Sequence, residues 1–200
     1  RLYSESPHMT SFSPDTAHVL ALLRACPAYK PTPLQRVRFG DGHTLFIKDE
    51  SNRMGLGAFK ALGGPYAVAR LIEDAYGQPL QPQDFSDAKV RAFAATMTFV
   101  CASAGNHGMA VAAGARIFGA RARIHLSHAV SEAFALRLRA QGADVVRSGD
   151  TYEESLTAAE DDARETGAVL LSDTCGADMA RPPALVMEGY TVIPEELRYT

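Results

Sequence analysis

Cysteine, unbalanced charge and long apolar runs are all scarce in this sequence. The three cysteines, Cys26, Cys101 and Cys175, are far apart and form no C-x-x-C pair, so we expect free thiols in a reducing compartment. A net charge of −3, from 20 basic and 23 acidic residues, provides no electrostatic reason to expect binding to nucleic acid or an anionic membrane. No apolar run approaches the length of a membrane span, and no signal-peptide pattern opens the chain. We therefore expect a cytoplasmic protein.

The first part of the chain predicts a mixture of short elements. We expect a helix from Ser13 to about Ala25, a hairpin over 35–48 that turns at 40–42, and a helix from about Ala58 towards Asp74. Pro65 should kink or delay that last helix, because proline lacks an N–H and its ring clashes with the preceding turn. Residues 77–87 are polar and contain proline, which is typical of a linker or domain crossing.

From about Ala94 onward, strand and helix patterns alternate with short loops. This alternation predicts an α/β fold with an open parallel sheet covered by helices. The expected strands are 96–101, 122–126, 143–147 and 168–171, and the expected helices are 106–118, 131–140 and 151–165. Gly119 and Gly142 stand where helix-ending glycines belong, and Thr151 with Glu154 forms a capping-box pattern.

Two segments carry the residues suited to chemistry. Lys48–Gly64 reads K-D-E-S-N-R-M-G-L-G-A-F-K-A-L-G-G and joins a strand to a helix, with Lys60 in the first turn of that helix. Gly55 and Gly57 permit positive φ or a close approach to a ligand, Phe59 offers a ring to a flat cofactor, and a lysine amine in such a place suits Schiff-base chemistry.

The second segment, Ala102–Gly108, follows a parallel strand and reads A-S-A-G-N-H-G. Ligands of open α/β sheets bind at this end of the strands, and Asn106 is a suitable N-cap beside N–H groups that favour anions. The residues alone leave open whether the loop binds a carboxylate or phosphate or is only a tight turn. It lacks the G-x-G-x-x-G dinucleotide pattern.

Together these segments resemble the fold-type II pyridoxal-phosphate enzymes, the superfamily of threonine dehydratases, cysteine synthases and the tryptophan synthase β-subunit. Within it, the chain is most similar to the diaminopropionate ammonia-lyases. The resemblance rests on four motifs and covers most of the chain after residue 30: residues 48–64, G-N-H-G at 105–108, S-D-T at 172–174 and V-M-E-G-Y at 186–190.

The resemblance implies a role for each matching residue. Lys60 would carry pyridoxal phosphate as a Schiff base and later remove the α-proton of the substrate. Phe59 would pack beside the cofactor, and Asn106 would donate a hydrogen bond to its 3′-oxygen. Asp173 matches an aspartate near the leaving amine, although without the resemblance it reads as a turn or capping residue.

The substrate carboxylate would lie in the loop after the strand 96–101, as the resemblance implies. The residues that the resemblance assigns to the substrate there are Ser103, Ala104, Gly105, Asn106 and His107, with His107 a structural member of the loop rather than an acid or base. No metal site is expected, since His125 and His128 read as surface or turn histidines.

Two departures from the ammonia-lyase pattern concern the substrate. Those enzymes have D-G-N-H-G, whose aspartate deprotonates the D-isomer, whereas this chain has Ala104 there. They also carry an aromatic W-x-G-Y stretch where this chain has Cys175–Met179. We therefore expect elimination from an L-amino acid, similar to diaminopropionate, to a 2-oxo acid and ammonia.

The resemblance also predicts domain organisation and partners. Residues 1–85 would be the N-terminal segment of the large cofactor domain, 86–185 the small α/β domain, and 186–200 the start of the return to the large domain. The glycine-rich phosphate cup and the residue facing the pyridine nitrogen would come from a C-terminal part, so we expect the N-terminal part of the full fold. A homodimer that binds a small amino acid follows from the same resemblance.

Two other hypotheses remain from the sequence. A dehydratase for serine, threonine or another 3-hydroxy amino acid would use the same scaffold, and Ala104 favours it. A non-catalytic α/β domain that binds an anion is the third reading, but it has no use for Lys60, the loop and Asp173 together. Ammonia release from a panel of amino acids distinguishes the lyases from the binding domain.

Overall fold

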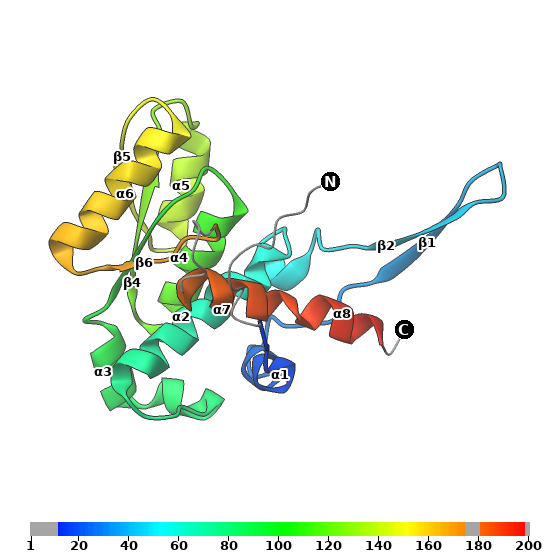
Figure 1. Ribbon diagram of the computed structural model, residues 1–200, viewed down its shortest axis with the longest axis horizontal. Helices are drawn as coiled ribbons and strands as arrows, with labels where there is room; N and C mark the ends of the chain where they lie inside the picture. The colour runs from blue at the N-terminus through cyan, green and yellow to red at the C-terminus, as the bar shows by residue number, and fades with distance from the viewer. Residues whose placement is uncertain (1–11, 175–180, 199–200) are drawn as a thin grey trace, which may run out of the picture.

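The computed structural model describes residues 12–174 and 181–198 and shows an α/β fold (Figure 1). Within these residues, a parallel sheet has four strands in the order β5-β4-β3-β6. The strands are β3 (Thr98–Ala102), β4 (Arg121–Leu126), β5 (Asp144–Arg147) and β6 (Val169–Leu170). The predicted parallel sheet is confirmed, and each strand begins and ends within two residues of its expected bounds.

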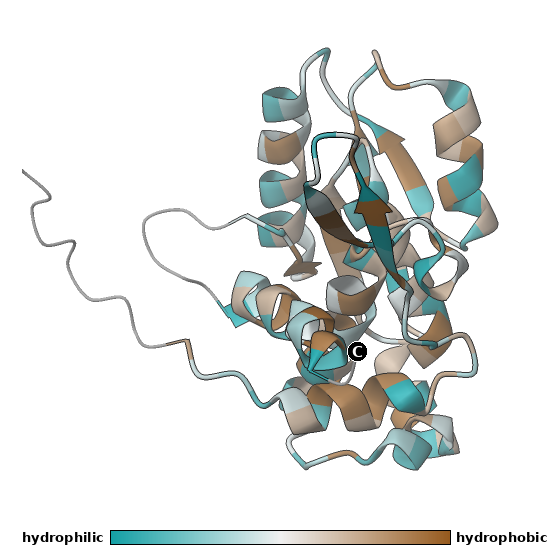
Figure 2. Ribbon diagram, turned by 90° about the vertical axis from the view of Figure 1, so that its right-hand side faces the viewer, coloured by the Kyte–Doolittle hydropathy of each residue, from teal (hydrophilic) through white to brown (hydrophobic). Residues whose placement is uncertain are grey.

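Helices cover both faces of this sheet. Phe99 and Cys101 of β3 join the main core with α4 (Asn106–Phe118), whereas Val100 and Ala102 face the other way and pack with α6 (Tyr152–Thr166). α5 (Glu132–Ala140) contacts β5 and α4. Figure 2 shows helices that carry both hydrophobic (brown) and hydrophilic (teal) residues around the strands.

The ends of the helices follow local sequence signals. Gly119 ends α4 in the left-handed region with φ 82°, and Gly142 follows α5 with φ 86°. Thr151 and Glu154 form the capping box expected at the start of α6. At the start of α4 the N-cap is Gly105 and Asn106 is the first helical residue, so the expected N-cap is off by one position.

The N-terminal part confirms the predicted helix and hairpin. Asp15 accepts a hydrogen bond from the N–H of His18 and caps α1 (Thr16–Arg24). β1 (Leu34–Arg38) pairs antiparallel with β2 (Thr44–Lys48), and this hairpin extends away from the parallel sheet (Figure 1).

α2 (Lys60–Tyr76) continues through Pro65, so the prediction that proline would delay the helix is wrong. The cause is tertiary packing against α4. A Cβ on Gly64 would lie 2.6 Å from Cβ of Ala110, and one on Gly114 would lie 2.8 Å from Cα of Pro65. Two glycines therefore let the helices approach closely at Pro65, and the buried contact offsets the unfavourable propensity.

Several short elements carry no clear sequence signal. The stretch expected as a linker contains η2 (Pro82–Ser86), whose Phe85 is buried and lies 4.7 Å from the ring of Phe118, and it leads into α3 (Ala88–Ala94). The boundary at residue 85 stays a prediction. Near the end of the chain, α7 (Arg181–Tyr190) packs on α2 and is followed by α8 (Val192–Leu197).

His125 is not the surface residue that its position suggested. Its side chain is buried, with Nδ1 2.7 Å from Oγ of Ser148 and Nε2 2.9 Å from Oδ2 of Asp162. Asp162, which lies on α6, also accepts a hydrogen bond from Arg123 at 2.5 Å. Both residues serve to join α6 to the sheet, a long-range pairing that helical periodicity does not reveal.

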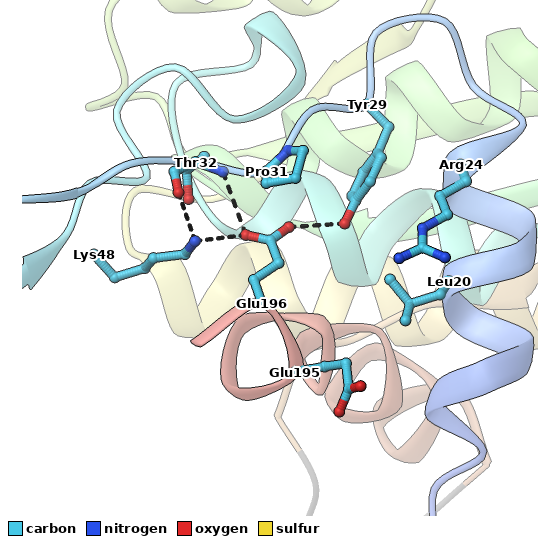
Figure 3. A pocket seen from close by; sticks show the side chains of 8 residues that line it. All are labelled: Leu20, Arg24, Tyr29, Pro31, Thr32, Lys48, Glu195 and Glu196. Carbon is cyan, nitrogen blue, oxygen red and sulfur yellow. Dashed lines mark hydrogen bonds and ion pairs between the residues drawn. The ribbon is translucent and has the colours of Figure 1, made fainter. Parts of the chain in front are cut away.

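A buried ion cluster joins the hairpin to α8. The side chain of Arg53 is fully buried and donates to Oε2 of Glu50 at 2.7 Å and to Oε1 of Glu196 at 2.7 Å. Lys48 and Tyr29 also bond to Glu196, at 2.7 and 2.8 Å, and Figure 3 shows both beside a pocket. The cluster anchors the residues that lead from β2 (Thr44–Lys48) through η1 (Arg53–Gly55) to α2.

The strand order creates a switch point next to β3. After β3 the chain adds β4 and β5 on one side, and it then returns to place β6 on the other side. The loops that follow β3 and β6 therefore meet at the carboxyl edge of the sheet, where open α/β sheets bind ligands.

The ion cluster should make the free energy of unfolding depend on pH through the ionisation of Glu196. Burial of Glu196 opposes its ionisation, but hydrogen bonds from Arg53, Lys48 and Tyr29 outweigh this and lower the pKa of Glu196 from 4.5 to about 2. Glu196→Gln should reduce the free energy of unfolding at neutral pH by about 3 kcal/mol, because it removes a buried partner of Arg53.

The loss should depend on pH in a defined direction. Because the pKa is lower in the folded state, the stabilisation is complete above about pH 4.5 and declines as the pH falls towards 2. Chemical denaturation across this range measures it, with exposed Glu160→Gln as the control. A difference between wild type and Glu196→Gln that stays constant with pH would contradict the assignment.

Candidate active site

The loop between β2 and α2 places Lys60 at the start of a buried helix. Gly55 and Gly57 have φ values of 71° and 82°, which confirms the left-handed conformations predicted for them. Met54 also has a positive φ, 50°, which is uncommon for a residue with a side chain. This tight turn ends at Phe59, and α2 begins at Lys60.

Lys60 forms an ion pair with Asp173, 113 residues later in the chain. Nζ of Lys60 donates to Oδ2 of Asp173, which lies in the segment after β6. The two side chains are 32% and 16% exposed, so the pair lies near the surface but is largely enclosed. The structure thus brings together the two residues that the sequence identified as catalytic candidates.

His107 joins the loops that follow β3 and β6. Its ring is 3% exposed, and Nε2 lies 2.8 Å from the carbonyl oxygen of Leu171, which requires a proton on Nε2. Nδ1 is then the acceptor nitrogen when the ring is neutral. It lies 3.8 Å from Oδ2 of Asp173 and is buried without a hydrogen-bond partner among the described residues.

Burial and charge act on the two titratable neighbours in opposite directions. Burial lowers the pKa of His107 below its ordinary value and favours the neutral ring. Burial of Asp173 opposes its ionisation, but the neighbouring His107 ring and the hydrogen bond from Lys60 outweigh burial and hold the pKa of Asp173 below its ordinary value. The Asp173 carboxylate is therefore charged at neutral pH.

The loop after β3 is held by its own serine. Oγ of Ser103 accepts hydrogen bonds from the N–H groups of Gly105, at 3.3 Å, and Gly108, at 2.9 Å. Ser103 is buried, and its hydroxyl supports the turn into α4. Ala104 and Asn106 are exposed at this turn, and the first residues of a helix have N–H groups without intrahelical acceptors.

An aromatic pair borders the lysine. Phe59 is 39% exposed, and its ring meets that of Tyr190 edge-to-face with 5.0 Å between centroids. Tyr190 was not among the predicted site residues, although the V-M-E-G-Y motif that contains it was part of the resemblance. Its hydroxyl is buried and has no hydrogen-bond partner among the described residues.

Other candidate features lie outside this site. Cys101 is a free, buried strand residue, and burial raises the pKa of its thiol; Cys175 falls outside the described residues. The pocket in Figure 3 is lined by the ion cluster and α1, and neither Lys60 nor Asp173 borders it. Within 12–174 and 181–198, no group of side chains is suited to hold a metal ion. No helix in those residues is long and apolar enough to cross a membrane.

Comparison with known proteins adds two curated relatives. The chain is 33% identical over 186 residues to the diaminopropionate ammonia-lyase of Salmonella typhimurium, covering 89% of this chain and 46% of that protein. It is 31% identical over 133 residues to a probable D-serine dehydratase of Sinorhizobium medicae, covering 62% and 30%. The chain spans about half the length of the ammonia-lyases it matches, or less.

A solved structure and a family model agree with these relatives. Escherichia coli diaminopropionate ammonia-lyase in complex with D-serine matches with a TM-score of 0.82 and 26% identity, over 92% of this chain and 48% of that one. The expected fold class and the resemblance are thereby confirmed. Residues 25–199 match the model described as pyridoxal-phosphate dependent enzyme. A lysine at the switch point of the sheet and a match over most of the sequence lead to one assignment: the chain belongs to the pyridoxal-phosphate-dependent enzyme family.

Proposed function

We propose that this protein is a pyridoxal-phosphate-dependent lyase that releases ammonia from an amino acid by α,β-elimination. The observation that carries the proposal is the Lys60–Asp173 pair at the carboxyl edge of the sheet. The 33% identity to an ammonia-lyase supports it. The preferred substrate is an L-amino acid similar to diaminopropionate, and the products are a 2-oxo acid and ammonia.

The residues around Lys60 fit a bound cofactor. Nζ of Lys60 would hold it covalently, the exposed ring of Phe59 would pack beside it, and Asn106 would bond to an oxygen of its ring. Nδ1 of His107 and the hydroxyl of Tyr190 are buried and have no partner in the described part of the chain, which is consistent with a ligand that completes the site. When bound, pyridoxal phosphate supplies an electron sink that stabilises the carbanion at the α-carbon.

Lys60 and Asp173 would carry out different proton transfers of the elimination. The free amine of Lys60 accepts the α-proton at Nζ. Asp173, which is paired with Lys60, lies where it can pass a proton to the group that leaves the β-carbon. His107 holds the loop of Asp173 through its bond to Leu171. A substrate carboxylate would bind the N–H groups at the start of α4, as we expected for residues 103–107, since the hydroxyl of Ser103 already supports the turn.

A dehydratase is the second candidate. Ala104 and the similarity to a probable D-serine dehydratase favour it, because loss of a hydroxyl and loss of an amine differ only in the leaving group. We further propose the cytoplasm as the location, a homodimer as the assembly and the division at residue 85 between a large and a small domain. The homodimer and the domain division follow from the family resemblance, and the cytoplasmic location follows from the widely separated cysteines.

Lys60→Ala should abolish the visible absorption band that pyridoxal phosphate acquires on the wild-type full-length protein, since it removes the covalent attachment. Ammonia release should fall to background. The measurements are an absorption spectrum and an ammonia assay, with exposed Lys89→Ala as the matched control. The assignment of Lys60 as the attachment residue would be refuted if the band persists in Lys60→Ala or if wild type shows no band.

The substrate panel separates the candidate functions. We expect ammonia from L-diaminopropionate to exceed that from L-serine, L-threonine and 3-phenylserine. A preference for the hydroxy amino acids would favour the dehydratase. Silence across the panel with cofactor bound would favour a binding domain.

Ala104→Asp should increase turnover of D-diaminopropionate at least tenfold, because it adds a carboxylate that can accept the α-proton from the opposite face. Initial rates of ammonia release from both enantiomers measure the change. Ala104→Asn adds similar bulk without a base and serves as the control. Equal turnover of D- and L-substrates by wild type would show that Ala104 does not limit stereospecificity.

A further inference from the structure

We propose that Tyr190 is a ligand-binding residue whose hydroxyl donates a hydrogen bond to an acceptor oxygen of the molecule held beside Lys60. The inference rests on the proposed function and extends it to a residue outside the expected site. Tyr190 is the last residue of α7 (Arg181–Tyr190) and reaches the site from an element far from Lys60 in sequence.

Close packing sets the position of the Tyr190 ring. Gly63 lies about one helical turn after Lys60, and a Cβ there would be 2.6 Å from Cε1 of Tyr190. A Cβ on Gly189 would be 2.7 Å from Cα of Gly63. Glycine at both positions lets the end of α7 press against the first turn of α2, while the edge contact with Phe59 supports the ring.

Among the residues that the structure describes, the Tyr190 hydroxyl has no hydrogen-bond partner, although a buried polar group normally has one. Most buried hydroxyls are hydrogen-bonded, because an unpaired one loses its water without compensation. Burial and the negative charge of Asp173 raise the pKa of Tyr190, so the phenol stays protonated and remains a donor. The unpaired hydroxyl therefore needs an acceptor.

The position of this donor favours a ligand as its partner. Tyr190 contacts Phe59, the residue before Lys60, and Asp173 influences its hydroxyl electrostatically. His107 Nδ1, 3.8 Å from Asp173, is a second buried atom that has no hydrogen-bond partner within 12–174 and 181–198, and it supplies an acceptor to the same region. A donor and an acceptor left unpaired around the same ion pair suit a polar ligand. The acceptor oxygen belongs either to the cofactor or to the carboxylate of the amino acid.

The test compares wild type, Tyr190→Phe and a control in the full-length protein. Tyr76→Phe is the control, because it removes a hydroxyl from the far end of α2 and keeps the ring contact with Phe93. Thermal unfolding of the ligand-free proteins comes first. Titration with pyridoxal phosphate then measures cofactor affinity, and titration of the loaded proteins with L- and D-alanine measures amino-acid affinity without a leaving group.

The expected result is an unchanged unfolding temperature for Tyr190→Phe and affinity about tenfold weaker in one of the two titrations. A weaker first titration assigns the oxygen to the cofactor, and a weaker second one assigns it to the amino acid. Unchanged affinities would overturn the proposal, and so would a drop in ligand-free stability beyond that of Tyr76→Phe, since the partner would then be protein. If the wild-type protein does not bind pyridoxal phosphate in the first titration, the proposed function is refuted as well.

Discussion

The pairing of β3 with β6 is the constraint on which the site depends. Because the chain returns across β3 after building β4 and β5, the loop with Ser103 and the loop with Asp173 leave the sheet at the same edge. The hydrogen bond from His107 to Leu171 fixes their relative position. Lys60 reaches this edge from a third element, α2, because α2 packs closely on α4 through Gly64 and Gly114.

The long lysine motif serves two physical purposes. Its first half supplies Lys48, Glu50 and Arg53 to the buried ion cluster with Glu196, which holds the segment against α8. Its second half provides the left-handed turn at Met54–Gly57 and then Lys60. A buried guanidinium needs carboxylate partners, so the fold constrains the identity of the residues in this cluster. The motif at residues 48–64 is long because it contains both the residues of the ion cluster and the turn that positions Lys60.

Electrostatics at the site follow from which groups are buried. His107 is enclosed and favoured in the neutral state, whereas Asp173 retains its charge through Lys60 and the ring beside it. The ion pair with Asp173 thus holds the Lys60 amine at the place where the proposed chemistry requires it. The proposed activity, the location of the cofactor and the role of Tyr190 all depend on this arrangement.

Local signals in the sequence determined the strands, the ends of the helices, the turn glycines and Lys60 as a candidate, whereas Asp173 became a candidate only through the family resemblance. Capping boxes, helix-ending glycines and the alternation of elements act over a few residues, so they are legible without a structure. Tertiary structure alone decided the continuation of α2 through Pro65, the burial of His125 with Asp162 and the closure of the Arg53 cluster by Glu196. It also revealed the hydroxyl of Tyr190, which is buried and has no partner among the described residues. Each of these rests on partners distant in sequence, and packing energy between distant segments is absent from any local pattern.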